Sequence, residues 1–192
     1  MSDDSRDKRS VNKKKEKEKR GRRWVVTVIL LTFVISSILQ MIQAGLMSKV
    51  NLAMAFVILI TFVLIGILFD IIGVAVTSAN ETPFHSLSSQ KIRGAKEAVR
   101  LIRNADRVGS FCNDVIGDIV GIISGSATTV IVAMIMSSGI NITNFTLTVV
   151  MTALVAALTI GGKAAGKRIA IDKSSSIVFF VGKVISYIAP AK

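Results

Sequence analysis

The chain has 192 residues, 51% of them hydrophobic, and a formal net charge of +12 from 24 Lys and Arg against 12 Asp and Glu. The apolar residues form blocks long enough to cross a bilayer, which takes about 20 residues, and this excludes an ordinary soluble domain. In such a chain positive charge is typical of cytoplasmic loops, so we expect no nucleic-acid partner. The single cysteine, Cys112, excludes an internal disulfide and a cysteine-rich metal site.

Residues 1–23 are highly charged and contain almost no apolar side chains. Such a segment cannot bury enough surface to offset the entropy of ordering, so we expect a disordered basic tail. On the cytoplasmic side of a membrane this tail would attract anionic lipid headgroups, and its charge would also orient the chain.

Four apolar stretches follow the tail, and each is long enough for a transmembrane helix. They cover residues 24–46, 52–78, 111–137 and 145–162. With both termini in the cytoplasm, every basic segment lies on the inner side and only Lys49 lies outside. The sequence therefore predicts an all-α integral protein of the plasma membrane that crosses it four times, with cytoplasmic N- and C-termini.

Two further helical segments are predicted at the cytoplasmic surface. Residues 81–108 are predicted to form a juxtamembrane pair of short helices, the second of which is basic and amphipathic. Residues 174–190 carry an apolar stripe at helical spacing, as in a helix that lies flat on a membrane. Anionic lipids are the expected neighbours of both segments, and packing on another protein domain is the alternative.

The third apolar stretch contains two carboxylates, Asp114 and Asp118, four residues apart. Gly117, Gly121 and Gly125 recur at every fourth position, a spacing that lets transmembrane helices pack closely. Because an aspartate inside a bilayer costs about 2.5–3.5 kcal/mol on insertion scales, we expect both carboxylates to face protein. They are candidates for a cation or proton site, and a pair of polar interfacial residues is the simpler interpretation.

More polar groups are predicted at the same depth. Asp70 lies inside the second apolar stretch, and the chain breaks into polar residues where that stretch ends. Oxygen donors at helix ends, lining a cavity in the protein, suit Mg²⁺ or Ca²⁺. The candidate cation-binding residues are Ser78, Asn80, Glu81, Asn113, Asp114 and Asp118.

The stretch TSANETPFHSLSSQKIRG, residues 77–94, resembles the Ser-Gly-x-Glu-Thr-Ala-x-Phe-Ser-Leu signature of the cyclin M / CorB–CorC transmembrane domain. Residues 95–108, AKEAVRLIRNADRV, resemble that family's juxtamembrane helix, and the third apolar stretch resembles its Gly-Asn-Asn-x-x-Asn helix. Residues 161–190 are similar to the turn and belt helix that close the domain. The positions that match the signature are Ser78, Glu81, Thr82, Phe84, Ser86 and Leu87.

This resemblance covers about residues 70–192 and implies that residues 52–192 form a domain of the cyclin M type. It implies a homodimer that transports Mg²⁺ or Co²⁺, bound between helices near the cytoplasmic half. The implied metal ligands are Ser78, Asp114 and Asp118. The family's asparagines fall near Asn113 and Gly117 or near Asp114 and Asp118, and the aspartates are the preferred pair. The span at residues 24–46 is then an addition at the N-terminus.

The chain departs from the family's pattern in two ways. The family's membrane glutamate falls on Gly162 or Lys163, where a lysine would repel Mg²⁺ or pair with buried aspartates. Lys163 and Asp70 are therefore candidates for an internal ion pair. Residues 1–192 contain no counterpart of the family's CBS domains, so we expect no nucleotide regulation in this chain.

Two functions stay open on these grounds. The first is a divalent-cation transporter with bound Mg²⁺. The second is a non-transporting membrane protein of the same fold, in which Lys163 neutralises the aspartates and the chain serves as an assembly or regulatory partner. We expect no enzyme, because the sequence shows no nucleophile–base pair, no histidine cluster and no phosphate-binding loop.

Overall fold

The computed structural model describes residues 3–139 and 143–188, and all the regular structure in these ranges is helical. The chain divides into two compact units, Met1–Met41 and Ile42–Lys192. Helix α1 (Asp3–Met47) accounts for the first unit, and its last turns belong to the second. Residues 3–23 of the basic segment, for which composition predicts disorder, are part of α1, and residues 1 and 2 lie outside the described residues. Lys, Glu and Arg favour helix, and a helix formed in the adjoining apolar stretch extends into them at small cost.

The second unit holds the remaining helices. In chain order they are α2 (Leu52–Ser78), α3 (Thr82–Ser89), α4 (Ala95–Arg103), α5 (Ala105–Ser110), the π-helical segment η1 (Phe111–Ile116), α6 (Gly117–Ser137), α7 (Asn144–Asp172) and α8 (Ser174–Ile188). The helices α3 and α4 correspond to the predicted juxtamembrane pair and α8 to the predicted C-terminal helix, whose last two predicted positions, 189 and 190, lie outside the described residues.

Within the described residues, four helical segments are long and apolar enough to cross a membrane. They are Val25–Met47, Leu52–Ser78, Ala105–Ser137 and Asn144–Asp172. Large apolar side chains are exposed along them, for example Leu64 and Leu68 on α2 and Leu154 on α7. Continuous apolar surface of this kind is typical of contact with lipid. The predicted class, an all-α protein with four candidate transmembrane helices, is confirmed.

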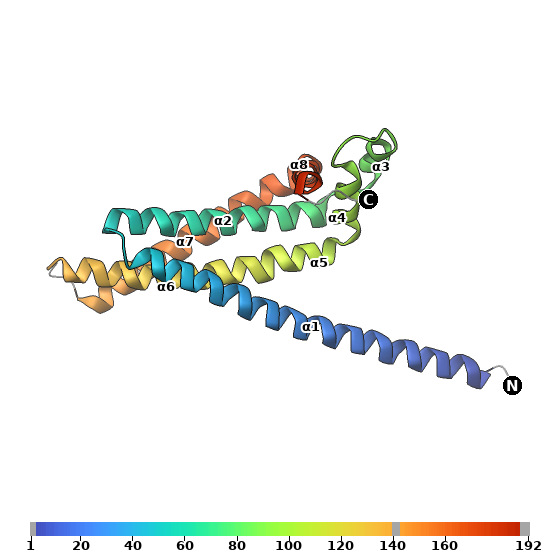
Figure 1. The fold of residues 1–192 in the computed structure, drawn as a ribbon, viewed down its shortest axis with the longest axis horizontal. Helices are drawn as coiled ribbons and strands as arrows, with labels where there is room; N and C mark the ends of the chain where they lie inside the picture. The colour runs from blue at the N-terminus through green and yellow to red at the C-terminus, as the bar shows by residue number, and fades with distance from the viewer. Residues whose placement is uncertain (1–2, 140–142, 189–192) are drawn as a thin grey trace. The chain divides into compact units, whose positions relative to one another are not determined.

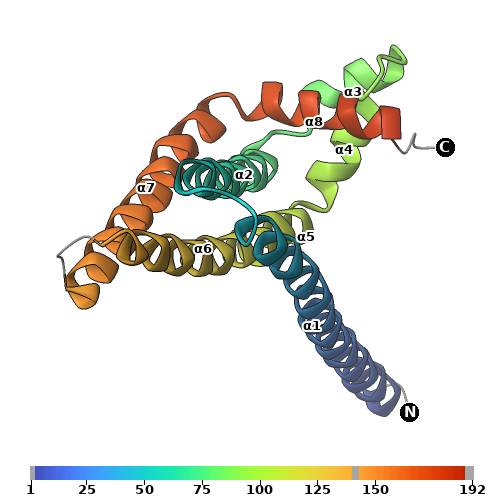
Figure 2. The ribbon, with the colours of Figure 1, turned by 60° about the vertical axis from the view of Figure 1, so that its left-hand side comes forward.

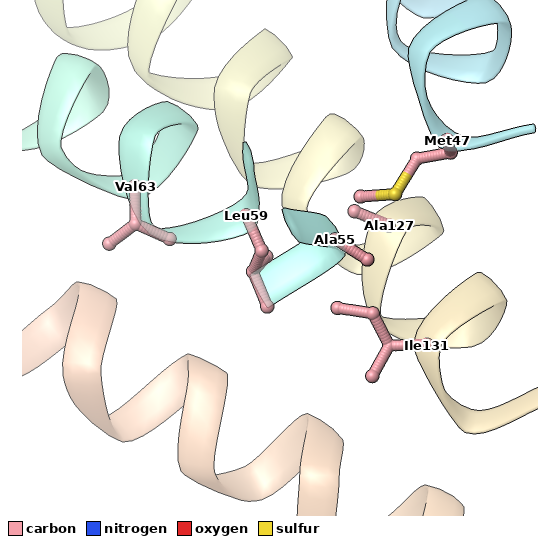
Figure 3. Close-up of a cluster of buried hydrophobic side chains, with 6 residues drawn as sticks. All are labelled: Met47, Ala55, Leu59, Val63, Ala127 and Ile131. Atoms are coloured by element: carbon pink, nitrogen blue, oxygen red, sulfur yellow. The ribbon is translucent and has the colours of Figure 1, made fainter. Parts of the chain in front are cut away.

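Helix α2 packs against both α6 and α7, and Figures 1 and 2 show it beside them in both views. A cluster of buried side chains joins α2 to α6 at the end of the unit where α2 begins (Figure 3). The cluster consists of Met47, Ala55, Leu59, Val63, Ala127 and Ile131. Asn51 Oδ1 caps α2 by accepting a hydrogen bond from Met54 N at 3.0 Å.

The contact between α2 and α7 depends on two glycines of α7. A Cβ built on Gly162 would overlap the Ile67 side chain, and one built on Gly166 would lie 2.7 Å from Ile71 Cγ1. These glycines lie one turn apart, as do their isoleucine partners, so the two helices interlock over one turn. Helix α7 therefore runs through the glycines to Asp172, although the sequence predicts the span to end at residue 162.

At the other end of α2, the helices α3, α4 and α8 gather into a cap, which both ribbon views show. Its buried cluster consists of Ala75, Val76, Phe84, Ala98, Ala170 and Val178. The Phe84 and Phe179 rings stack with their centroids 6.5 Å apart, which fixes α8 over α3. The cap thus holds α8 directly after the last candidate span.

Candidate intramembrane polar site

An ion pair joins α2 to α7 inside the candidate membrane segments. Lys163 Nζ lies 3.7 Å from Asp70 Oδ1, and the two side chains are 27% and 17% exposed. Lys163 also lies close to α6, because a Cβ built on Gly117 would be 3.3 Å from its Nζ. Lys163 thus lies between α2, α6 and α7, with Asp70 as its counter-ion. The sequence had left Asp114 and Asp118 open as alternative counter-ions.

The third candidate span is not regular at this depth. Between α5 and α6 the chain winds as the π-helical segment η1, in which Gly117 N donates to Cys112 O. Single π-helical turns inside α-helices are rare and are frequent at functional sites. Because η1 carries Asn113 and Asp114, two of the candidate site residues lie on this irregular turn.

Asn113 has a buried oxygen that lacks a partner. Within the described residues no hydrogen bond reaches its Oδ1. The side chain lies against Gly73 of α2, where a Cβ would overlap it. An unpaired buried carbonyl costs free energy unless a donor or a cation reaches it. The sequence singled out Asn113, but Gly73, which makes room for it, was missed.

Asp114 and Asp118 lie on the outer face of their span. Both are exposed, and in the described part of the chain neither makes an ion pair or a hydrogen bond through its side chain. The face of α6 that packs on α2 consists of larger residues such as Ile119, Ile123 and Ala127. The neighbour that the two carboxylates need inside a bilayer is therefore not supplied by α2 or α7.

The glycines of α6 divide between the two faces. Gly117 is buried beside Lys163. Gly121 and Gly125 are exposed, and a Cβ built on either would meet no neighbouring element of the described chain within 4 Å. Gly121 and Gly125 share their face with Asp118, since these positions lie three and seven residues after it. We call this surface the glycine–aspartate face: Asp114, Asp118, Gly121 and Gly125.

The polar residues after α2 build the turn into α3. Ser78 is the exposed last residue of α2, and Asn80 Oδ1 accepts a hydrogen bond from Thr82 N at 3.0 Å. Glu81 Oε1 accepts a hydrogen bond from Arg103 Nε at 2.6 Å and lies 2.8 Å from His85 Nε2. The hydrogen bond from Arg103 lowers the pKa of Glu81 below its ordinary value of 4.5. Asn80 and Glu81 therefore already have partners within the cap.

One polar contact inside the candidate spans was missed from the sequence. Gln43, near the end of α1, is buried, and its Oε1 accepts a hydrogen bond from Ser126 Oγ at 3.3 Å. Its Nε2 has no hydrogen-bond partner among the described residues. The available signal was a polar residue inside an apolar stretch, which in a membrane protein usually faces other helices.

Residues 3–139 and 143–188 contain no group of three or more His, Cys, Asp and Glu side chains that could hold a metal ion. Asn113 Oδ1 is buried against Gly73 of α2, whereas the carboxylates of Asp114 and Asp118 lie together on the outer face of the span. These are the hard ligands that Mg²⁺ takes, but one chain supplies too few of them for a closed cage of protein ligands. Mg²⁺ usually keeps several waters, so an open set of this kind fits a hydrated ion.

Comparisons of the chain with protein-family profiles, with curated proteins and with solved structures find no match.

Proposed function

We propose that the chain is a divalent-cation transport protein of the plasma membrane, with hydrated Mg²⁺ as its substrate. The cation binds at the outer face of the third candidate span, where the carboxylates of Asp114 and Asp118 are its ligands. The resemblance of residues 77–94 to the cyclin M / CorB–CorC signature supports this choice of substrate. Ser78 belongs to the same site in that family pattern, at the cytoplasmic mouth.

The single observation that carries the proposal is the pair of exposed carboxylates, Asp114 and Asp118, on one face of a candidate membrane span, with no ion pair to either among the described residues. A cation between the two carboxylates would balance their charge. A bound cation would also reduce the cost of exposing these carboxylates to lipid. That cost is about 2.5–3.5 kcal/mol for each aspartate at mid-bilayer.

The proposed working form is a homodimer that meets at the glycine–aspartate face. Small residues let two transmembrane helices approach closely, and Gly121 and Gly125 leave open space on that face. A second copy brings a second pair of aspartates toward the first, so the number of oxygen donors around a cation doubles. Four carboxylates in one interface would repel one another strongly without cations between them.

Both termini are proposed to be cytoplasmic. The support is the distribution of Lys and Arg, which lie in residues 1–23, 79–110 and 163–192, with Lys49 alone between the first two candidate spans. On this orientation the cap of α3, α4 and α8 lies at the inner surface of the membrane, and the cation site is nearer to the cytoplasm than to the outside.

Binding can be tested by thermal unfolding of the purified full chain in detergent at increasing Mg²⁺. A ligand that binds only the folded state raises the unfolding temperature, and the rise grows with the logarithm of the ratio of ligand concentration to Kd. We expect this rise in the wild type and in the control variant Asp172→Asn, which removes an exposed carboxylate at the end of α7. We expect its loss in Asp114→Asn and Asp118→Asn. An equal rise in all four proteins would refute the site.

The second candidate, a non-transporting assembly or regulatory partner, is favoured by one contact. Lys163 lies at or next to the position of the glutamate in the related pattern, and its Nζ is 3.7 Å from Asp70 Oδ1. A fixed positive charge between α2, α6 and α7 is unfavourable for a passing Mg²⁺. If the absence of transport were measured in folded protein, this contact would explain it.

A further inference from the structure

A pocket of about 460 Å³ lies in the cap, away from the intramembrane site. It is bounded by the end of α3, the turn that follows, the first turn of α4 and one residue of α8. The lining residues are Ser88, Lys91, Ile92, Arg93, Gly94, Lys96, Glu97 and Ser186. Three cations and one carboxylate leave the lining with a net positive charge, so the pocket suits an anion.

The turn that carries the cations is held by backbone hydrogen bonds. Lys91 N donates to Ser88 O at 3.0 Å and Ile92 N to Leu87 O at 3.0 Å. Lys91 itself adopts a positive φ of 56°, which is uncommon outside glycine. A turn fixed in this way presents Lys91 and Arg93 in a set geometry, which lowers the entropy cost of binding a ligand.

Helix α8 closes the pocket because its backbone touches the start of α4. Gly94 has a φ of +90°, and a Cβ on it would lie 2.7 Å from Lys183 Cα. Conversely, a Cβ on Gly182 would lie 2.5 Å from Gly94 O. Since the pocket also opens on the first turn of α4, the positive end of that helix adds to its attraction for anions.

Arg93 connects the pocket to the outer face of α8. Its guanidinium carbon lies 4.1 Å from the centre of the Tyr187 ring, a cation–π contact that holds the group flat. Stacking on the tyrosine ring occupies one face of the guanidinium. The N–H donors lie in the plane of the group and point outward from its edge, so they can still bind phosphate. Tyr187 thus acts as a positioning residue for Arg93.

Tyr187 belongs to an apolar stripe that is exposed on the outer face of α8. The stripe consists of Phe180, Val184, Tyr187 and Ile188, which are 67%, 42%, 64% and 80% exposed and follow helical spacing. The opposite face of α8, with Val178, Gly182 and Ser186, is buried in the cap. A helix that follows a candidate span and exposes such a stripe suits the boundary between lipid chains and headgroups.

We propose that this pocket binds the headgroup phosphate of an anionic phospholipid whose acyl chains lie along the α8 stripe. Lys91 and Arg93 bind the phosphate oxygens, Lys96 adds positive charge, and Tyr187 sets the plane of Arg93. Charge and apolar surface meet at one residue pair, Arg93 and Tyr187, and a phospholipid is the ligand class that joins a phosphate to a hydrocarbon chain. The site is independent of cation transport.

The test is native mass spectrometry of the purified full chain, titrated with phosphatidylglycerol or with phosphatidylcholine. We expect phosphatidylglycerol to bind at least fivefold more weakly to the double variant Lys91→Gln/Arg93→Gln than to the wild type. The control, Lys49→Gln, removes the same kind of charge from the opposite end of α2 and should bind as the wild type does. Folding is checked by circular dichroism, and Arg93→Lys should retain part of the affinity.

Three results would overturn the proposal. One is equal binding of phosphatidylglycerol to the wild type and the double variant. Another is an equal loss in Lys49→Gln, since this would mean attraction to net charge alone. The third is displacement of the lipid from the wild type by inorganic phosphate at equimolar concentration, which would assign the pocket to a free phosphate compound. Retention of the lipid under those conditions supports the phospholipid.

Discussion

Lys163 and Asp70 face each other across α7 and α2, with 3.7 Å between Nζ and Oδ1, inside two candidate membrane spans. Neither side chain is fully buried, and each would be an unpaired charge in an apolar layer without the other. Their positions correspond along the two helices, since each precedes the C-terminal end of its helix by a similar number of residues. The pair therefore fixes the register of α7 on α2, together with the glycine contacts at Gly162 and Gly166.

Breaking this ion pair is expected to destabilise the fold. Lys163→Met or Asp70→Asn alone should cost about 1–2 kcal/mol of unfolding free energy, below the roughly 3–5 kcal/mol of a fully buried pair because both side chains are partly exposed. The double variant should be more stable than the sum of the single losses predicts. Unfolding in detergent measures this, with Lys167→Met on the exposed side of α7 as the control. Additive losses would show that the two side chains do not interact.

The contact between Gly182 and Gly94 is expected to be sensitive to one methyl group. Gly182→Ala should lower the free energy of unfolding by about 1–3 kcal/mol, because its Cβ would press on backbone atoms that cannot move aside. Gly161→Ala on α7 is the matched control, since a Cβ there meets nothing within 4 Å of the described chain. That control should be neutral or stabilising by about 0.5–1 kcal/mol. Equal melting temperatures for both variants would contradict the close approach.

The Glu81–Arg103 hydrogen bond predicts a dependence of stability on pH. Arg103 lowers the pKa of Glu81 in the folded chain below 4.5, so the ionised carboxylate stabilises the fold at pH values above 4.5. This contribution is lost as the pH falls through the lowered pKa. The wild type should therefore melt at a higher temperature than Glu81→Gln at pH 7, and the difference should shrink as the pH falls below 4.5. Arg103→Gln should remove most of the difference at pH 7; a difference that is constant with pH would contradict this.

The glycine–aspartate face is expected to mediate self-association. Gly121→Leu or Gly125→Leu should weaken the dimer at least tenfold, about 1.4 kcal/mol, because a large side chain separates the helix backbones. Ile122→Leu, beside that face, is the volume-matched control. Light scattering or cross-linking in detergent would measure the dimer fraction. An unchanged dimer in both glycine variants would mean that the dimer does not form through this face.

The sequence predicted the class and the positions of the spans because long apolar runs have few alternatives. The bounds of α2, Leu52–Ser78, agree with the predicted stretch. The span predicted to end at residue 162 belongs to a helix that continues to Asp172, and in this helix Gly162 and Gly166 make room for Ile67 and Ile71. Composition identifies small residues, but only the packing shows whether they break a helix or join two.

The site was harder to predict than the spans. The sequence singled out Asn113, Asp114, Asp118, Asp70 and Lys163 as unusual polar residues in apolar stretches. Which of them meet depends on the rotation of each helix about its axis. The π-helical turn at Phe111–Ile116 changes that rotation within the third span, and no periodicity in the sequence reveals it. The pairing of Lys163 with Asp70 was therefore one option among several.

The most direct test of the proposed function is Mg²⁺ flux into proteoliposomes that contain the full chain, followed with a trapped fluorescent indicator. The wild type and Asp172→Asn should carry Mg²⁺ down its gradient, and Asp118→Asn should reduce that flux at least tenfold without loss of folded protein. Absence of flux in folded wild-type protein, over gradients of either direction, would contradict the transport proposal and favour the partner-protein alternative.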